Sequence, residues 1–294
     1  MQKTPCFYPA LLAGLLLGSA SAWGQTTTAR PLNDTGMTWS GKISAPPVTG
    51  TAGNSTTCNG ADPAGQDCQS GRDAAALLGP LPKTGASALN NGQANGFDFT
   101  KISNAGNELA ATATLGSEDD DWACTRDNVT GLIWEVKVND PTHLRHQGHS
   151  YTWYNTDPTT NGGYAGVEDE FFDNSALQMK SNAVLCSGSG MPQCNTEAYI
   201  KAVNAQGLCG YNDWRMPTQE ELVSLLDYGR TNVTQPMIDP DYFPHTSSNP
   251  VVVDWAGLSS ATVGSPTSVD FLTGVIGQGY AMYPGRVRAV RGAP

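Results

Sequence analysis

The sequence predicts an α+β domain with a twisted antiparallel sheet and two helices, preceded by a loop-rich N-terminal segment. The C-terminal third contains short apolar runs broken by glycine, which is typical of antiparallel strands joined by tight turns. Two amphipathic stretches, 196–205 and 218–228, lie between those runs and earlier strand-like segments, and each carries helix start and stop residues. Helices set between early and late strands are typical of the α+β class.

The first 22 residues have the organisation of a secretory signal peptide. Lys3 supplies the positive charge, residues 10–17 form an apolar core, and Ala20-Ser21-Ala22 offers a small-residue cleavage site. No later stretch approaches the ~20 apolar residues that a membrane span requires. We therefore expect an exported chain, in the periplasm, at the cell surface or outside the cell, with no transmembrane segment after cleavage.

Residues 23–95 are rich in Gly, Ala, Ser, Thr, Asn and Pro and contain few large apolar side chains. Such a composition cannot build a core of its own, so we predict a loop-rich segment. Residues 97–102 then alternate in strand fashion and predict an extra strand at the edge of the following domain, which we place at 96–294.

The stretch from Cys209 to Asp227 joins a strand-like piece to a helix. Pro217 ends the strand-like Trp214-Arg215-Met216 run, and Thr218 with Glu221 predicts a capping box that starts a helix ending near Gly229. The other helix, 196–205, is closed by Gly207. The remaining predicted strands are 132–138, 151–154, 251–255, 268–272, 280–283 and 287–291.

Three separated motifs resemble one known family. They are DNVTGLIWEVK at 127–137, the Trp214–Pro217 corner and VRAVRG at 287–292, and they occur in the order found in the C-terminal domain of the bacterial collagen-like adhesin, the Lcl C-terminal domain. The resemblance covers about 122–292. It implies a C-type-lectin-like fold and a non-enzymatic adhesion module that binds sulfated polysaccharide at cell surfaces.

Cysteine usage agrees with export. Of the seven cysteines, Cys6 falls in the signal, and the six that remain are Cys58, Cys68, Cys124, Cys186, Cys194 and Cys209. Cys194 and Cys209 flank a predicted helix whose ends lie about 15 Å apart, beyond disulfide reach. We therefore favour the pairs Cys58–Cys68, Cys186–Cys194 and Cys124–Cys209. No Cys-x2-Cys pair is present, which argues against a zinc knuckle.

The chain is acidic, and many of its carboxylates lie in one stretch, residues 118–173. Its net charge of −11 becomes −12 when Lys3 leaves with the signal, and 118–173 holds twelve carboxylates against three basic residues. Such a surface repels nucleic acid and other polyanions at long range, so we expect no nucleic-acid partner.

Two groups of residues are candidate metal ligands. Calcium prefers hard oxygen ligands, and five acids in and near the runs 118–121 and 168–170 could supply them: Asp119, Asp121, Glu168, Asp169 and Asp173. Neither run has the spacing of an EF-hand loop. The alternative is a solvated acidic loop. His143, His146 and His149 are three of only four histidines, but Pro141 and Gly148 favour a solvated loop over a transition-metal site.

The candidate ligand-binding residues lie near the C-terminus. Arg286 and Arg288 would share one face of a strand and bind an anionic group on a glycan, while Tyr280 and Tyr283 could stack on sugar rings. Internal pairing with acids such as Asp213 is the alternative for these arginines and Arg291. The leading hypothesis is an exported, non-enzymatic recognition or adhesion module for carbohydrate or a surface protein, as monomer or oligomer. An exported enzyme acting on envelope polymers and a structural subunit of a surface assembly are the alternatives.

We predict three disulfides and no free thiol in the mature chain, because an unpaired thiol would be reactive after export. Mass spectrometry before and after alkylation measures this. Two or more cysteines alkylated without reduction, or a peptide linking Cys194 to Cys209, would contradict the proposed pairing.

Overall fold

The computed structural model describes residues 33–37, 67, 71–72, 96–230, 234–247, 253–259 and 265–292. The predicted secretory signal and both cysteines of the predicted Cys58–Cys68 pair lie outside these residues. The α+β class is confirmed, with strands in three sheets and two α-helices among the described residues.

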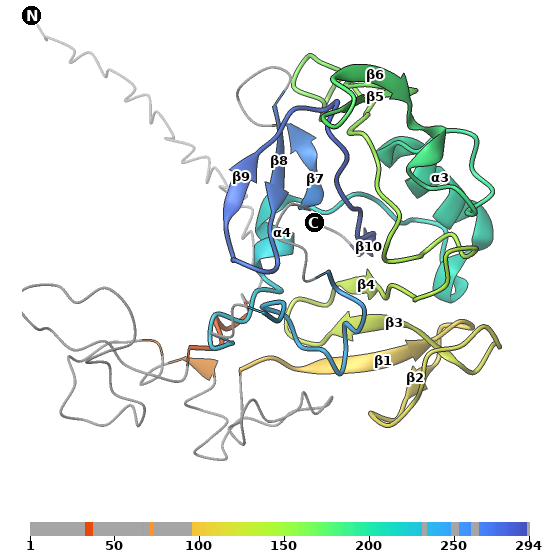
Figure 1. Ribbon diagram of the computed structural model, residues 1–294. Coiled ribbons are helices and arrows are strands. Elements are labelled where there is room, and N and C mark those ends of the chain that lie inside the picture. Colours follow the sequence, from red (N-terminus) through yellow and green to blue (C-terminus); the bar gives the residue numbers. More distant parts are fainter. Residues whose placement is uncertain are drawn as a thin grey trace, which may run out of the picture. The chain divides into compact units, whose positions relative to one another are not determined.

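The largest sheet has five antiparallel strands in the order β10-β4-β3-β1-β2 (Figure 1). They are β1 Phe99–Ser103, β2 Glu108–Leu109, β3 Trp122–Asp127, β4 Ile133–Glu135 and β10 Val290–Arg291. The strand predicted at 97–102 is therefore confirmed as β1, but the short β2 pairs with its outer side, so β1 is not the edge. The last strand of the chain joins the sheet at its opposite end.

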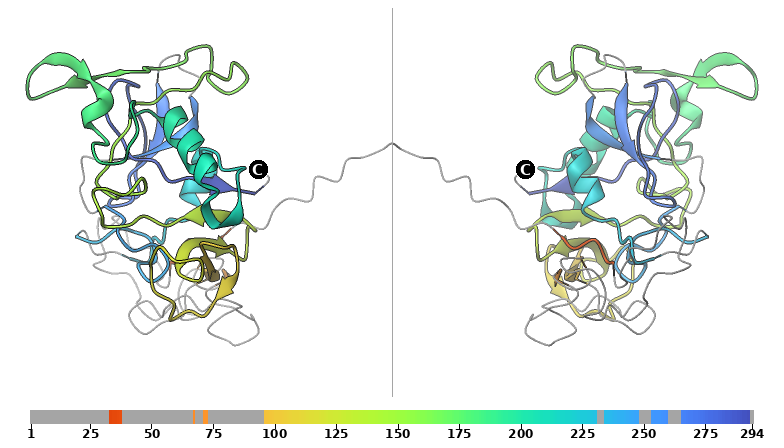
Figure 2. Two further views of the ribbon diagram at one scale, coloured as in Figure 1. Left: turned by 90° about the vertical axis from the view of Figure 1, so that its right-hand side faces the viewer. Right: turned by 90° about the vertical axis from the view of Figure 1, so that its left-hand side faces the viewer.

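The other two sheets are smaller. A hairpin is formed by β5 Glu170–Asp173 and β6 Gln178–Ser181, and a three-stranded sheet by β7 Asp254–Ser259, β8 Pro266–Val269 and β9 Ile276–Gln278. Both helices and the β7–β9 sheet lie toward the edge of the five-stranded sheet that is formed by β4 and β10 (Figure 1). The β5–β6 hairpin projects from the domain (Figure 2).

Two predicted strands are wrong. Residues 151–154 form only isolated bridges, because their backbone groups bond to three different segments. The Tyr151 N–H donates to the Gly285 carbonyl (2.7 Å), the Thr152 N–H to the Cys194 carbonyl (3.0 Å), and the Trp153 carbonyl accepts from the Val167 N–H (3.0 Å). Residues 280–283 form a turn in which the Tyr283 N–H donates to the Tyr280 carbonyl (2.9 Å), and the strand of this region is β9, just before it.

The first helix, α3, spans Thr196–Gln206 and agrees with the prediction. The Asn195 side chain accepts from the Ala198 N–H, and Gly207 ends the helix in the left-handed region at φ 65°. Glycine is favoured there because it has no Cβ to clash.

The second helix, α4, has the predicted capping box between Thr218 and Glu221 but spans only Gln219–Val223. Beyond Val223 the chain tightens into a turn, in which the Leu225 and Leu226 N–H groups donate to the Leu222 and Val223 carbonyls (3.1 and 3.0 Å). The helix does not resume, because the Asp227 N–H donates to the Met237 carbonyl (2.9 Å). The extension to residue 228 and the role of Gly229 as its terminal glycine are therefore wrong.

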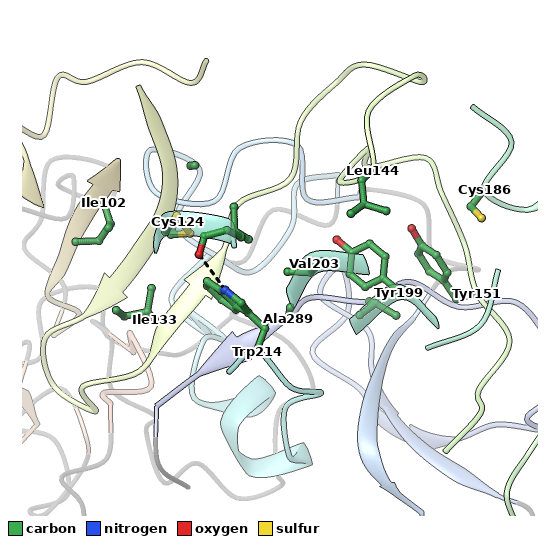
Figure 3. Packing of buried hydrophobic residues seen from close by; sticks show 14 of the residues in the cluster. Ile102, Cys124, Ile133, Leu144, Tyr151, Cys186, Tyr199, Val203, Trp214 and Ala289 are labelled. Carbon is green, nitrogen blue, oxygen red and sulfur yellow. Dashed lines mark hydrogen bonds between the residues drawn. A yellow bond between two sulfur atoms is a disulfide. The ribbon is translucent and has the colours of Figure 1, made fainter. Parts of the chain in front are cut away.

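Residues on the two faces of the β4 segment belong to different hydrophobic clusters, because successive side chains of a strand point to opposite faces. Ile133 belongs to the cluster shown in Figure 3, which also contains Trp214, Val203 and Tyr199. Trp134 belongs to the other cluster, which contains Leu222 of α4 and Phe99 of β1. The five-stranded sheet therefore has a buried core on both faces.

Two of the three predicted disulfides lie among the described residues, and both are confirmed. Cys124–Cys209 joins β3 to the short 3-10 turn Leu208–Gly210 with a Cα separation of 6.5 Å. Cys186–Cys194 closes a local loop just before α3, with a Cα separation of 5.6 Å. The first bridge fixes the Trp214 corner to the large sheet.

Trp214 is the buried centre of that corner. Its indole N–H donates to the Leu208 carbonyl (3.0 Å), and the Asn204 amide bonds to both the N–H and the carbonyl of Trp214 (2.7 and 2.8 Å). The next residue, Arg215, exchanges two backbone hydrogen bonds with Val290 of β10 (2.9 and 3.0 Å). The predicted strand is thus reduced to one bridge, but the predicted junction between strand and helix is present.

A buried ionic network lies where β4, α3 and the C-terminal segment meet. The Glu135 carboxylate is 2.6 Å from the Lys137 ammonium, accepts from the Tyr199 hydroxyl, and accepts from the Ala289 N–H (2.9 Å). Burial alone would raise the pKa of Glu135, but attraction to Lys137 and these hydrogen bonds lower it below its usual value. Glu135 is therefore an ionised carboxylate inside the core.

The described residues all belong to one compact unit that spans 31–294. Asn33 connects the N-terminal segment to it by donating to the Asp127 carboxylate (2.5 Å) and to the Ser224 carbonyl (3.0 Å). The Tyr228 N–H donates to the Thr35 carbonyl (2.7 Å). Part of the segment predicted as loop-rich therefore packs on the domain.

Asp227 lies beneath this N-terminal contact. A Cβ on Gly36 would sit 2.0 Å from the Asp227 carboxylate, so only glycine fits at that position. Burial raises the pKa of Asp227 to about 7, with Asp239 and Asp34 adding to the rise and the Gly229 N–H and Arg230 opposing it. Asp227 therefore changes charge near neutral pH.

Replacing Trp214 by alanine should lower the free energy of unfolding by about 3–5 kcal/mol, because it empties a fully packed site. Trp214→Phe should cost less, since most of the apolar contact is kept. Urea unfolding measures both variants. A loss below about 1 kcal/mol for Trp214→Ala would show that the corner is not part of the core.

Asp227→Asn should change the dependence of stability on pH. Because the folded-state pKa lies above the unfolded value near 3.9, ionisation destabilises the fold between pH 4 and about 7. The variant should therefore gain up to about 4 kcal/mol relative to the parent between pH 4 and pH 8.

Asp213→Asn is the control for this experiment. The hydrogen bond from Arg291 lowers the pKa of Asp213. Removing the Asp213 carboxylate should therefore change the pH dependence of the unfolding free energy, relative to the parent, in the opposite direction. Parallel pH curves for the parent and Asp227→Asn would contradict the raised pKa.

Candidate functional site

A cavity of about 600 Å³ lies between the N-terminal half of α3 and the corner that follows Trp214. This volume is within the range of small-ligand sites. The corner supplies Arg215, Met216, Pro217 and Thr218 to its lining. The Trp214–Pro217 motif, which the sequence predicts as a junction between strand and helix, thus also forms part of the wall of a cavity.

Apolar side chains form most of the walls: Trp153, Ile200, Met216 and Pro217. Trp153 is held from two sides, because its indole N–H donates to the Ala256 carbonyl (2.9 Å) and its backbone N–H to the Ala281 carbonyl (3.0 Å). The Gly257 N–H donates to the Pro217 carbonyl (2.7 Å), which joins β7 to the corner. The walls are therefore fixed by neighbouring backbone.

Charged and polar groups form the rim. The Glu197 carboxylate accepts from both the N–H and the hydroxyl of Thr156 (2.7 Å each) and pairs with Lys201 one turn later (2.5 Å). Burial opposes ionisation of Glu197, but the hydrogen bonds from Lys201 and Thr156 lower its pKa overall. Asp157 also lines the cavity, and hydrogen bonds from Thr159 lower its pKa. Both rim carboxylates are ionised at neutral pH.

Sequence reasoning missed this cavity, because its lining comes from four separate stretches, near residues 155, 200, 216 and 257. The only available signal was the Trp214–Pro217 motif itself.

The predicted ligand residues Tyr280 and Tyr283 lie on the surface beside Phe172 of β5. We name these three residues the aromatic strip. The ring centroids of Tyr280 and Tyr283 are 5.8 Å apart, and those of Tyr283 and Phe172 are 6.0 Å apart. Tyr280 is 62% exposed, and the Phe172 N–H donates to the Met282 carbonyl (3.0 Å), which holds the hairpin against the tyrosines.

The structure contradicts an exposed strip formed by the C-terminal arginines. Arg288 is 1% exposed, and its guanidinium lies over the rings of Phe243 and Phe271 (5.4 and 5.7 Å). Arg286 is half-buried, and burial lowers its pKa while Asp254 opposes that shift. Arg291 pairs with Asp213 (2.7 Å), so the predicted internal pairing is present for this arginine.

The acids predicted as calcium ligands do not come together. Asp121 accepts from the Glu118 N–H (3.0 Å) within its own turn, whereas Asp173 accepts from Ser175 and pairs with Lys180 (2.5 Å) in the β5–β6 hairpin. Asp119, Glu168 and Asp169 belong to no metal-ligand group among the described residues either. In the described part of the chain, no three histidine, cysteine or acidic side chains converge as a metal site would require.

The three clustered histidines lie in a loop, as predicted. The His143 Nδ1 accepts from the Arg145 N–H (3.0 Å), and the rings of His146 and His149 meet edge to face at 5.1 Å. Burial and the nearby His146 lower the pKa of His149. His149 is buried rather than solvated, so this loop is packed on the domain.

The family model of the Lcl C-terminal domain matches residues 123–291, which is more than half of the chain. No curated protein matches, and no solved structure matches, so the C-type-lectin-like fold stays a prediction. The matched region contains all but the first residue of β3, both helices, the cavity lining and β10, and the chain belongs to the Lcl C-terminal domain family.

Proposed function

We propose that this chain is an exported, non-enzymatic recognition or adhesion module that binds carbohydrate through the aromatic strip. The single observation that carries the proposal is the exposure of Tyr280, a residue that is 62% exposed although its ring is in contact with that of Tyr283. Large exposed apolar groups that gather in a patch mark interaction sites in soluble domains.

The chemistry of the strip fits a sugar. The apolar C–H face of a pyranose packs on an aromatic ring, and tyrosine adds a hydroxyl that can bond to a sugar hydroxyl. Tyr283 is fixed between Tyr280 and Phe172, so little side-chain entropy is lost on binding.

Charge favours an uncharged sugar over the sulfated polysaccharide that the family resemblance implies. The chain carries a net charge of −11, and Arg288 is buried, which leaves Arg286 as the one predicted anion ligand with partial exposure. Long-range repulsion of a polyanion therefore opposes such binding.

Export is supported by the chemistry of the cysteines. Cys124–Cys209 and Cys186–Cys194 are both present, and disulfides persist in oxidising compartments. Among the described residues no helix is long and apolar enough to cross a membrane. We assign 1–22 as the signal, 23–95 as an N-terminal segment and 96–294 as the binding domain.

Tyr280→Ala should abolish or strongly reduce glycan binding without changing the melting temperature, because the ring is largely exposed. A glycan array, read with and without calcium, measures binding. Leu177→Ala is the matched control, since Leu177 is 77% exposed at the hairpin turn and lies outside the strip. Equal glycan binding by Tyr280→Ala and the parent would contradict the proposed site.

A further inference from the structure

The cavity beside α3 differs chemically from the aromatic strip. Its walls are apolar, and Met216 supplies a thioether next to the indole of Trp153. Thioether sulfur makes favourable contacts with aromatic rings. An apolar or aromatic group of a ligand is therefore the part that these walls can accept.

The rim carries more negative than positive charge. Two acids, Asp157 and Glu197, line the cavity itself. Two more lie next to lining residues: Glu168 is hydrogen-bonded to Tyr154, and Glu221 forms an ion pair with Arg215. The two cations are both paired, Lys201 with Glu197 at 2.5 Å and Arg215 with Glu221 through two bonds of 2.7 Å. Four carboxylates against two cations leave a local excess of negative charge.

Ionisation of the rim is secured by local hydrogen bonds. Thr156 donates twice to Glu197, and Thr159 donates to Asp157 through its N–H and its hydroxyl (2.9 and 2.7 Å). Asp157 and Glu197 therefore stay negatively charged down to acidic pH. A cationic group on a ligand is the electrostatic complement of these two carboxylates.

We propose that this cavity binds a partner polypeptide by taking an aromatic side chain that is flanked by basic residues. The aromatic ring fills the space between Trp153, Ile200 and Met216, and the basic neighbours face Glu197 and Asp157. This site is separate from the proposed carbohydrate site, because the two share no lining residue.

Three short peptides test the two parts of this proposal: acetyl-Lys-Phe-Lys-amide, acetyl-Glu-Phe-Glu-amide and acetyl-Lys-Ala-Lys-amide. Titration of the full mature chain, followed by amide NMR signals, should show binding of the first peptide only. The Gly257 and Thr218 signals should move because both residues line the cavity, whereas the Gly277 signal on β9 should not.

Variants then separate the cavity from its rim. Ile200→Trp should fill the cavity and weaken binding of acetyl-Lys-Phe-Lys-amide at least tenfold. Glu197→Gln should weaken it by about two- to fivefold, the range of an exposed charge pair, and raised salt should do the same. Glu108→Gln, on β2 and outside the cavity, is the control and should bind as the parent does.

Two outcomes would overturn the proposal: equal binding of the acidic and basic phenylalanine peptides, or unchanged binding by both Ile200→Trp and Glu197→Gln. Tyr280→Ala should keep peptide binding, so failure of the carbohydrate site and failure of this site are distinguished. A melting curve for each variant shows that it is folded.

Discussion

The ionised carboxylate of Glu135 is the constraint on which the rest of the structure depends. Removing a charge from water costs several kcal/mol, so this carboxylate must be matched inside the protein. Its partners come from three separate places: Lys137 beyond β4, Tyr199 on α3 and Ala289 before β10. The network therefore specifies how these elements meet, whatever its net contribution to stability.

The position of the cavity beside α3 follows from that arrangement. Tyr199 fixes the face of α3 that points inward, and this orientation turns Glu197, Ile200 and Lys201, its neighbours on the helix, toward the cavity. On the other side, the backbone pairing of Arg215 with Val290 places the corner against the same C-terminal segment. The corner is therefore positioned by direct contact with Val290, and α3 through Glu135, which also bonds to Ala289.

Features set by neighbours in sequence could be predicted, and those set by distant partners could not. The capping box of Thr218 and Glu221 depends on four consecutive residues, and the alternating faces around Trp134 depend on the pleat alone. The end of α4 depends instead on Met237, and the burial of Arg288 on Phe243 and Phe271. The cavity was missed for the same reason, although its motif at Trp214 was recognised.

A double-mutant cycle between Glu135 and Tyr199 tests the central role of the buried network most directly. The free energy of unfolding would be measured in urea for Glu135→Gln, Tyr199→Phe, the double variant and the parent. The account predicts a coupling free energy of at least about 1 kcal/mol, because the two side chains satisfy one another in the core. Effects that add within about 0.5 kcal/mol would contradict it, since independent residues cannot jointly fix α3 against the sheet.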